Sequence, residues 1–206
     1  VITDPPYYDS IHYSELANFF YVWMKEFCPD IDFFARETID STKEAIVNKG
    51  HNKGAKEYTD LMAGVFSSCH KVLKDNGKLV FTFHHKKVEA WWTIAESLSR
   101  AGFCVVDTFA VESEYKVNPH IRDKETLDMD LVLICEKKNP TVESPLDIFS
   151  SLIVMDSKEH SNPNWHYLHF IGLLLRETTR CFDNPLVDFD WFVEMNKKHN
   201  SINQIS

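Results

Sequence analysis

The sequence predicts an α/β protein with a partly parallel sheet, an antiparallel pair of strands at its end, and helices after that pair. Two observations support this class. Short apolar runs typical of buried strands alternate with amphipathic segments of helical period. Two later strand-like runs follow each other without a helix between them, and such neighbours most simply pair antiparallel. After Pro140 the pattern becomes helical, and we expect residues 140–206 to pack on the sheet, extend a recognition region or meet a partner.

The composition fits one folded α/β unit. The chain has 206 residues, of which 44% are hydrophobic, enough for a substantial core. No apolar run approaches the roughly 18 residues of a membrane-spanning helix. The five cysteines are widely spaced and include no C-x-x-C pair, so we expect reduced thiols in a cytoplasmic protein and no metal site. The sequence begins with valine and lacks a leader pattern, and we expect it to be part of a longer protein.

The most informative stretch is residues 1–8, V-I-T-D-P-P-Y-Y. Val1 and Ile2 favour a buried strand, and the prolines cannot continue it because they lack a backbone N–H. The strand therefore ends at Asp4, whose carboxylate sits on a stiff, extended corner. Ligands of open α/β sheets bind outside the carboxyl ends of the strands, so this corner is a candidate site.

Two segments separate the corner from the next strand. Residues 11–27 have apolar side chains at helical spacing, and we predict a helix whose aromatic stripe packs in the core. Residues 36–57 are polar and predict a mobile loop with room for a short helix. Four lysines and one glutamate between Lys43 and Lys56 make this the most basic patch near the corner. It is either a phosphate-contacting segment or a solvated loop.

Helices and strands alternate over the next eighty residues. The amphipathic segment 58–74 predicts a helix that ends at Asn76 and Gly77, and the apolar run 78–84 predicts a buried parallel strand. The remaining predictions are a helix at 88–101, strands at 103–111 and 129–136 around a polar loop at 112–128, and helices at about 146–155, 164–181 and 186–198.

The strand at 78–84 ends in H-H-K-K. Parallel strands joined by a crossover point their carboxyl ends the same way, so His85 and Lys86 should lie at the same edge as Asp4. They belong either to the candidate site or to an ordinary polar strand end. Adjacent histidines on a strand point to opposite faces, so His84 and His85 do not predict a metal site.

The corner resembles a known catalytic motif. The tetrapeptide D-P-P-Y at residues 4–7 is similar to the motif of amino-group DNA methyltransferases, which methylate adenine N6 or cytosine N4. The longer run from Thr3 to Asp9, with the aromatic residues up to Trp23, resembles adenine-specific DNA methylases that carry a conserved domain of unknown function and often a zinc ribbon. Some of these are linked to restriction-modification or phage defence. His85 and Lys86, followed by Glu-Ala-Trp, match the same family. The tetrapeptide alone would fit an ordinary loop, but the strand before it and the aromatic run after it favour the catalytic interpretation.

This resemblance implies a fold, a cofactor and a substrate. The fold would be a partial class I (Rossmann-like) methyltransferase sheet, whose final strand inserts antiparallel. Residues 1–139 would be the catalytic half of a methyltransferase domain, and residues 140–206 a helical appendage. The cofactor would be S-adenosyl-L-methionine, and the substrate a DNA adenine flipped out of the duplex.

The family's pattern also gives roles to the four corner residues. The exocyclic amine of a base is a weak nucleophile, because its lone pair is delocalised into the ring. Asp4 and the carbonyl of Pro5 would accept hydrogen bonds from the two N–H groups, on a corner that Pro6 helps to brace. Asp4 would also take the released proton as a general base. Tyr7 would stack on the flipped base, which is worth roughly 1–3 kcal/mol.

Further residues are expected near the substrate or the cofactor. Tyr8 would contact the base, while His85 and Lys86 would contact a phosphate or orient the flipped nucleotide. Thr3 would face the cofactor together with Asp4. In the loop at 112–128, the candidates for covering the base are Tyr115, Asn118, His120 and Arg122.

The glycine-rich turn that normally holds S-adenosylmethionine does not occur in this sequence. The six glycines are scattered, and none forms a Phe-x-Gly-x-Gly pattern. We expect the turn to precede Val1 or to come from another chain, which would leave the first strand as an open sheet edge. Because exposed edges pair with other chains, we expect a partner subunit or a homodimer across that edge.

Two other functions fit the same residues. One is amino-methylation of a base in RNA. The other is a catalytically silent partner subunit, which the net charge of −9 and the missing turn favour and the intact Asp4 disfavours. The negative charge also argues against simple nucleic-acid binding, which relies on Lys and Arg. Cytosine N4 enzymes more often carry serine in place of Asp4, so the motif favours adenine.

Overall fold

The structure is a computed structural model that describes residues 1–113, 128–138, 144–148 and 162–203. None of the helices in these ranges combines the length and the apolarity that crossing a bilayer requires. In chain order the helices and strands are β1 (Ile2–Thr3), α1 (Tyr13–Phe27), the 3-10 turns η1 (Asp32–Phe34), η2 (Ser41–Lys43) and η3 (Lys49–His51), α2 (Ala55–Val72), β2 (Leu79–Phe83), α3 (Val88–Arg100), β3 (Phe103–Glu112), β4 (Met129–Lys137), α5 (Pro163–Arg180) and α6 (Phe189–Asn203).

Four strands form one mixed sheet in the order β1-β2-β4-β3. β1 and β2 are parallel, and β4 lies antiparallel between β2 and β3. The predicted α/β class and its antiparallel terminal pair are confirmed, and the arrangement is a partial Rossmann-like sheet followed by helices. Within the described ranges β1 pairs with β2 alone, and Ile2 is 87% exposed, so the first strand is an open edge as expected.

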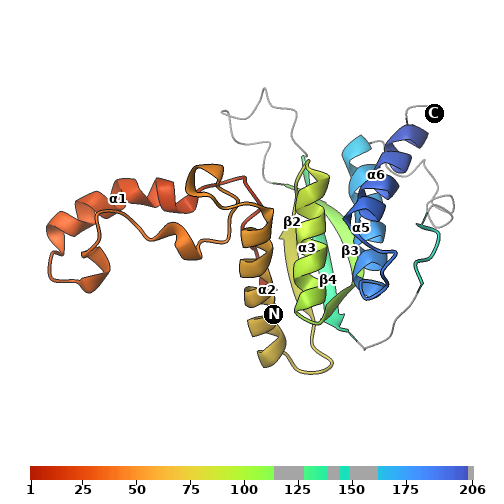
Figure 1. The fold of residues 1–206 in the computed structure, drawn as a ribbon, viewed down its shortest axis with the longest axis horizontal. Helices are drawn as coiled ribbons and strands as arrows, with labels where there is room; N and C mark the ends of the chain where they lie inside the picture. The colour runs from red at the N-terminus through yellow and green to blue at the C-terminus, as the bar shows by residue number, and fades with distance from the viewer. Residues whose placement is uncertain (114–127, 139–143, 149–161, 204–206) are drawn as a thin grey trace.

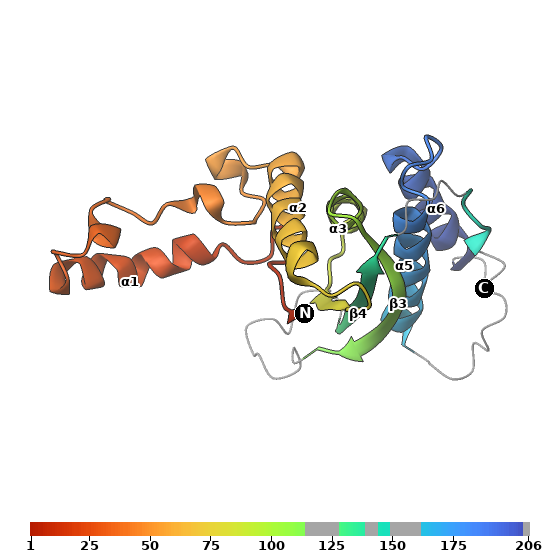
Figure 2. The same ribbon diagram turned by 90° about the horizontal axis from the view of Figure 1, so that it is seen from below.

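One face of the sheet carries the core. α2, α3 and α5 lie side by side over this face, and α6 packs against α3 and α5 (Figures 1 and 2). Buried and half-buried side chains alternate along β2 and β4, because successive strand residues point to opposite faces. Trp91 of α3 is fully buried here and meets Phe83 of β2 edge to face, with 5.0 Å between ring centroids.

α5 shares this core rather than standing apart from it. Its inward side includes Leu168, Phe170 and Leu174, all fully buried. Thr179 Oγ1 accepts a hydrogen bond of 2.9 Å from the backbone N–H of Val105 in β3. α5 therefore packs on the sheet and α6 on the helices, while the boundary at residue 139 stays a prediction. The predicted helix at 146–155 and the loop at 112–128 lie largely outside the described residues.

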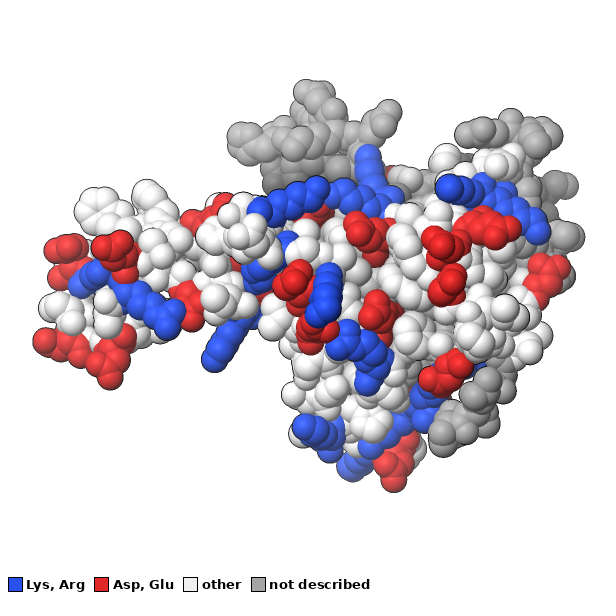
Figure 3. All heavy atoms as spheres, viewed as in Figure 1, with Lys and Arg blue, Asp and Glu red and all other residues white. Residues whose placement is uncertain are grey.

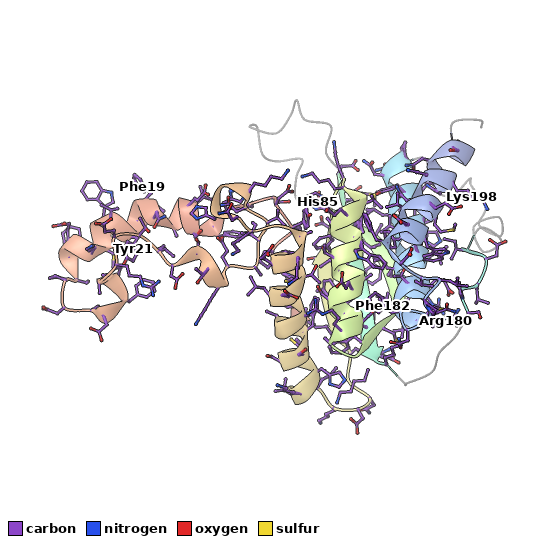
Figure 4. All side chains as sticks on the ribbon, in the orientation of Figure 1. Phe19, Tyr21, His85, Arg180, Phe182 and Lys198 are labelled. Atoms are coloured by element: carbon purple, nitrogen blue, oxygen red, sulfur yellow. The ribbon has the colours of Figure 1, made fainter. Side chains whose placement is uncertain are left out.

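The aromatic stripe of α1 is where the sequence prediction is wrong. α1 and the segment that returns from it project from the sheet as an arm (Figure 1). Leu16, Phe20 and Trp23 are 63%, 66% and 59% exposed. On another side of α1, the hydroxyl of the buried Tyr21 donates to two carbonyls of the return segment at 3.0 and 3.1 Å, while Phe19 points outward (Figure 4). Helical periodicity identifies an apolar face, but it does not say what that face meets.

Gly172 marks a close approach of α5 to the sheet. A Cβ atom there would lie 2.1 Å from Oγ1 of Thr108 in β3, whereas a Cβ at Gly64 of α2 would have no heavy atom within 4 Å. Alanine gains about 1 kcal/mol of helix propensity over glycine at either position. We therefore expect Gly64→Ala to raise the free energy of unfolding by about 0.5–1 kcal/mol. Gly172→Ala should lower it by up to about 2 kcal/mol, because overpacking costs more than propensity gains. Chemical denaturation of both variants checks this, and equal effects would contradict the close approach.

Candidate active site

The pairing of β1 with β2 places the corner at the carboxyl edge of the sheet. Thr3 lies opposite Phe81, so the residues that follow, Asp4 and Thr82, come side by side. Asp4 is exposed to solvent instead of being turned into the core. The strand-direction argument from the sequence therefore predicted the location of this carboxylate correctly.

Two hydroxyl groups fix one oxygen of Asp4. Thr82 Oγ1 donates to Asp4 Oδ1 at 2.6 Å, and the Tyr7 hydroxyl reaches the same oxygen at 2.7 Å. The Tyr7 hydroxyl also lies 2.7 Å from Thr82 Oγ1, so the three oxygen atoms form a triangle in which the two hydroxyl protons are shared. Within the described ranges no donor contacts Asp4 Oδ2. The carboxylate is thus oriented through one oxygen, and the second oxygen is left to accept a hydrogen bond from a ligand.

The ring of Tyr7 forms a half-buried wall of the corner. Burial, together with the hydrogen bond to Asp4, raises the pKa of Tyr7 above its ordinary value, so the phenol stays a protonated donor at neutral pH. The ring meets Phe83 and His84 edge to face, at centroid distances of 5.3 and 4.9 Å. No aromatic ring of the described residues stacks parallel to it.

The two prolines present their carbonyls differently. The Tyr58 hydroxyl donates to the Pro6 carbonyl at 2.8 Å, and the backbone N–H of Tyr8 reaches the same carbonyl at 3.2 Å. No donor in the described part of the chain contacts the Pro5 carbonyl. Pro6 therefore ties the corner to α2, while Pro5 is itself buried and its carbonyl has no donor among the described residues.

Tyr8 does not line the site. It is 3% exposed, its ring is edge-on to Tyr58, and its hydroxyl donates to Glu89 Oε2 at 2.8 Å. Its φ of +51° is a left-handed conformation that costs a large side chain about 1–3 kcal/mol. The expected contact of Tyr8 with a base is incompatible with this burial. Tyr8 instead anchors the turn that follows the prolines.

His85 also supports the corner from behind. It is 8% exposed, with Nε2 2.8 Å from Asp9 Oδ1, and its Nδ1 accepts a 3.0 Å hydrogen bond from the backbone N–H of Lys87. The proton is therefore on Nε2, which donates to Asp9. The ammonium group of Lys87 pairs with Asp9 and lies 5.9 Å from the centroid of the Tyr8 ring. Burial lowers the pKa of His85. The expected phosphate contact of His85 is not supported by this buried, fully paired geometry.

The exposed edge beside the corner is locally basic. Lys86 and Lys87 are exposed directly after β2, close to where His85 leads into α3 (Figure 4). Lys and Arg side chains gather along this margin of the molecule (Figure 3). In the basic loop, Lys53 is turned inward and donates to the carbonyl of Ser41 at 2.8 Å, so it does not reach a phosphate.

Two neighbours of the corner were missed by sequence reasoning. Thr82 holds both Asp4 and Tyr7, and the sequence signal that could have found it is its place as the only polar residue in the strand L-V-F-T-F. His84, the ring beside Tyr7, pairs through Nδ1 with Asp130 of β4. No local pattern predicts that pair, because Asp130 approaches only through the β2–β4 register.

Comparison with known families agrees with this geometry. A family model described as DNA methylase, for enzymes acting at N6 and N4 positions, matches residues 1–199. The chain belongs to the DNA methylase family. Searches of curated proteins and of solved structures returned no match. Methylases of this family transfer a methyl group from S-adenosylmethionine to amino groups of nucleic-acid bases.

The residues of this chain form an incomplete site for the cofactor. Gly64 and Gly172 lie inside helices, and Gly54 is the N-cap of α2. None of the chain's glycines forms a Gly-x-Gly turn after a strand, which is the usual cradle of such cofactors. The residues present do not form a complete binding site for S-adenosylmethionine. The expected contacts of Thr3 and Asp4 with it stay predictions.

Thr82 provides a test of the hydrogen-bonded triangle. Thr82→Val keeps the shape of the side chain but removes the hydroxyl that orients Asp4, so we expect methyl transfer by the natural protein to fall about 10- to 100-fold. Thr82→Ser retains the hydroxyl and should stay within a few-fold of the wild type. Initial rates with labelled S-adenosylmethionine measure both. Equal rates for the two variants would show that the Thr82 hydroxyl does not contribute to methyl transfer.

His85 makes the stability of the corner depend on pH. Its pKa in the unfolded chain is about 6.5, and burial lowers it in the folded state. Between these two pKa values the unfolded chain binds more protons, so the free energy of unfolding falls as the pH decreases below about 7. His85→Gln keeps a neutral donor and acceptor and should reduce this slope. Urea denaturation at several pH values between 7.5 and 5.5 measures it. A slope that His85→Gln leaves unchanged would contradict the assignment.

Proposed function

We propose that this chain carries the target-amine site of an S-adenosylmethionine-dependent methylase that acts on the N6 amine of adenine in DNA. The observation that carries the proposal is the exposed Asp4 carboxylate, fixed through Oδ1 by the hydroxyls of Tyr7 and Thr82 at the carboxyl edge of the sheet. An isolated exposed carboxylate would rotate freely. This one is held with its second oxygen available, as recognition of an amine requires.

The chemistry follows from the acceptors at the corner. Asp4 Oδ2 and the Pro5 carbonyl would accept the two hydrogens of an exocyclic amine, which draws the nitrogen lone pair out of conjugation with the ring. Charge-assisted hydrogen bonds of this type are the stronger kind. Once the nitrogen becomes cationic by methylation, Asp4 would accept its proton and pass it to solvent. S-Adenosylmethionine supplies the methyl group in this family.

Binding of the base relies on Tyr7. A base must leave the duplex before its amine can enter the corner. The half-buried Tyr7 ring is contacted by Phe83 and His84, and its hydroxyl is hydrogen-bonded to Asp4, so its orientation is fixed before the base arrives. Stacking on such a ring contributes roughly 1–3 kcal/mol. The exposed Lys86, at the end of β2, is proposed to contact a backbone phosphate.

The open β1 edge is proposed to receive the polypeptide that holds the cofactor. β1 pairs on one side with β2, and Ile2 is 87% exposed within the described structure. Exposed strand edges are templates for pairing with further chain. A strand added there would bring a cofactor-binding turn to the same carboxyl edge as Asp4, because parallel strands end at one edge.

Product analysis tests the proposal. The wild-type protein is incubated with labelled S-adenosylmethionine and with DNA and RNA duplexes of matched sequence. The nucleic acids are then digested, and the nucleosides are separated. The proposal expects label in N6-methyladenine from DNA. Label in N4-methylcytosine would replace adenine by cytosine as the target, and label in RNA alone would establish the RNA alternative. No transfer by a protein that binds S-adenosylmethionine would favour the silent partner subunit, for which the net charge of −9 is the supporting observation.

A further inference from the structure

α1 presents an apolar seam that the described chain leaves uncovered. Five residues recur at alternating three- and four-residue spacing and share one side of the helix, which is the period of the core positions in a two-stranded coiled coil. Their exposed fractions lie between 54% and 78%. The seam consists of Tyr13, Leu16, Phe20, Trp23 and Phe27.

The size of the seam is sufficient for an interface. Fully buried aromatic side chains remove about 150–250 Å² each from water. The exposed parts of four aromatic residues and a leucine therefore offer roughly 600 Å² on one copy. Two such surfaces facing each other would bury on the order of 1,200 Å², the lower end of the range for stable interfaces. An isolated helix of this length is only marginally stable in water. Burial of its apolar side against a partner would therefore stabilise α1.

Two exposed lysines lie at the root of the arm, beside the hydrogen-bonded carboxylates of Glu15 and Glu44. Ser14 Oγ, in the first turn of α1, donates to Glu44 Oε2 at 2.6 Å. The side-chain amide of Asn48 donates to Glu15 Oε1 of α1 at 2.7 Å. These contacts place residues 43–49 beside the start of the seam. Lys43 and Lys49 are exposed there.

The tip of the arm is acidic. Glu26 in the last turn of α1 and three carboxylates in the segment after it are exposed, and the far end of the arm shows acidic side chains on both sides of a smaller basic group (Figure 3). None of the four forms an ion pair with the residues that the structure describes. The three carboxylates in the segment after α1 are Asp30, Asp32 and Glu37.

We propose that two copies of this chain pair through α1, antiparallel and seam against seam, with Phe20 near the two-fold axis. This orientation brings the exposed carboxylates at the tip of each arm, such as Glu26 and Asp30, to the exposed Lys43 and Lys49 at the root of the other. It also aligns the two helix dipoles favourably, since opposite helix ends then lie together. A parallel pair would place acid against acid. A two-fold interface must be self-complementary, and the seam with exposed carboxylates at one end and exposed lysines at the other has that property.

The oligomeric state of the full chain tests the seam. Sedimentation equilibrium between about 1 and 50 μM should show a dimer for the wild type. Phe20→Glu buries a charge in the seam and should raise the dimer dissociation constant more than about 100-fold. Because Phe20 is exposed in the single copy, the variant should keep its circular dichroism spectrum. Val72→Glu, at a 77% exposed position at the end of α2, is the matched control and should dimerise normally.

Charge exchange tests the antiparallel orientation. One variant carries Glu26→Lys and Asp30→Lys, and the other carries Lys43→Glu and Lys49→Glu. Each alone should dimerise at least tenfold more weakly, because tip and root then repel. An equimolar mixture should form a heterodimer of near wild-type affinity. A wild-type monomer at every concentration, a dimer that survives Phe20→Glu, or a mixture that stays as weak as its components would overturn the proposal. A different protein bound to the seam of a monomer would overturn it as well.

Discussion

Asp4→Asn is expected to lower the rate of methyl transfer about 10²- to 10⁴-fold, the range typical for loss of a positioned acid–base group. Asparagine has almost the same shape, and its carbonyl can still accept the hydrogen bond from Thr82. Its amide nitrogen, however, is a donor, and in place of Oδ2 it would face the N–H groups of the target amine. The variant also has no carboxylate to accept the released proton. Initial rates with labelled S-adenosylmethionine and DNA measure the effect in the natural protein.

The control for this prediction is Asp75→Asn. Asp75 is fully exposed beyond α2, where it pairs with Lys137 at 3.1 Å, far along the chain from the corner. Its replacement should change the rate by less than twofold. Because Asp4 is itself exposed, Asp4→Asn should melt close to the wild-type temperature. A rate that Asp4→Asn leaves within threefold of the wild type would remove the catalytic role of this carboxylate.

Trp91→Ala is expected to lower the free energy of unfolding by about 3–5 kcal/mol. The side chain is fully buried between the sheet and the helix layer, and it packs against Phe83. Its indole N–H donates to the carbonyl of His85 at 2.8 Å, so alanine would leave both a cavity and an unpaired carbonyl. A loss of this size is a large part of the 5–15 kcal/mol that typically stabilises a domain. Urea denaturation with circular dichroism detection measures it.

Two further variants separate the parts of this loss. Trp91→Phe keeps an aromatic ring but loses the hydrogen bond, so it should cost clearly less than Trp91→Ala. Phe109→Ala removes an aromatic ring that is 51% exposed and should change the free energy of unfolding by about 0.5 kcal/mol or less. If Trp91→Ala and Phe109→Ala were equally mild, Trp91 could not be the centre of the core.

The location of the site could be predicted from the sequence because it depends on local rules. Proline at positions 5 and 6 has to end the first strand, whatever surrounds it. The apolar run at 78–84 has to be a strand with the same direction, since a helix intervenes. These two facts place Asp4 and the end of β2 at one edge, and the structure confirms it through contacts between Tyr7 and Thr82.

The environment of individual side chains could not be predicted in the same way. Tyr7 and Tyr8 are neighbours of identical type, yet the first lines the corner and the second is buried against Tyr58 and Glu89. The positive φ of Tyr8 turns its ring into the core, and no sequence pattern signals that angle for a tyrosine. The phosphate contact expected for His85 is likewise not supported by the structure, because Asp9 pairs with the buried imidazole.

By itself the sequence determined the succession of helices and strands, the antiparallel end of the sheet and the carboxylate that ends the first strand. These features follow from the period of apolar residues and from the restricted backbone of proline. Only the tertiary structure decided that Thr82 orients Asp4, that Tyr8 is buried and that the aromatic side of α1 is exposed. The physical reason is that periodicity defines which side chains share a face, whereas the partner of that face is set by strand register and by contacts between residues distant in the chain.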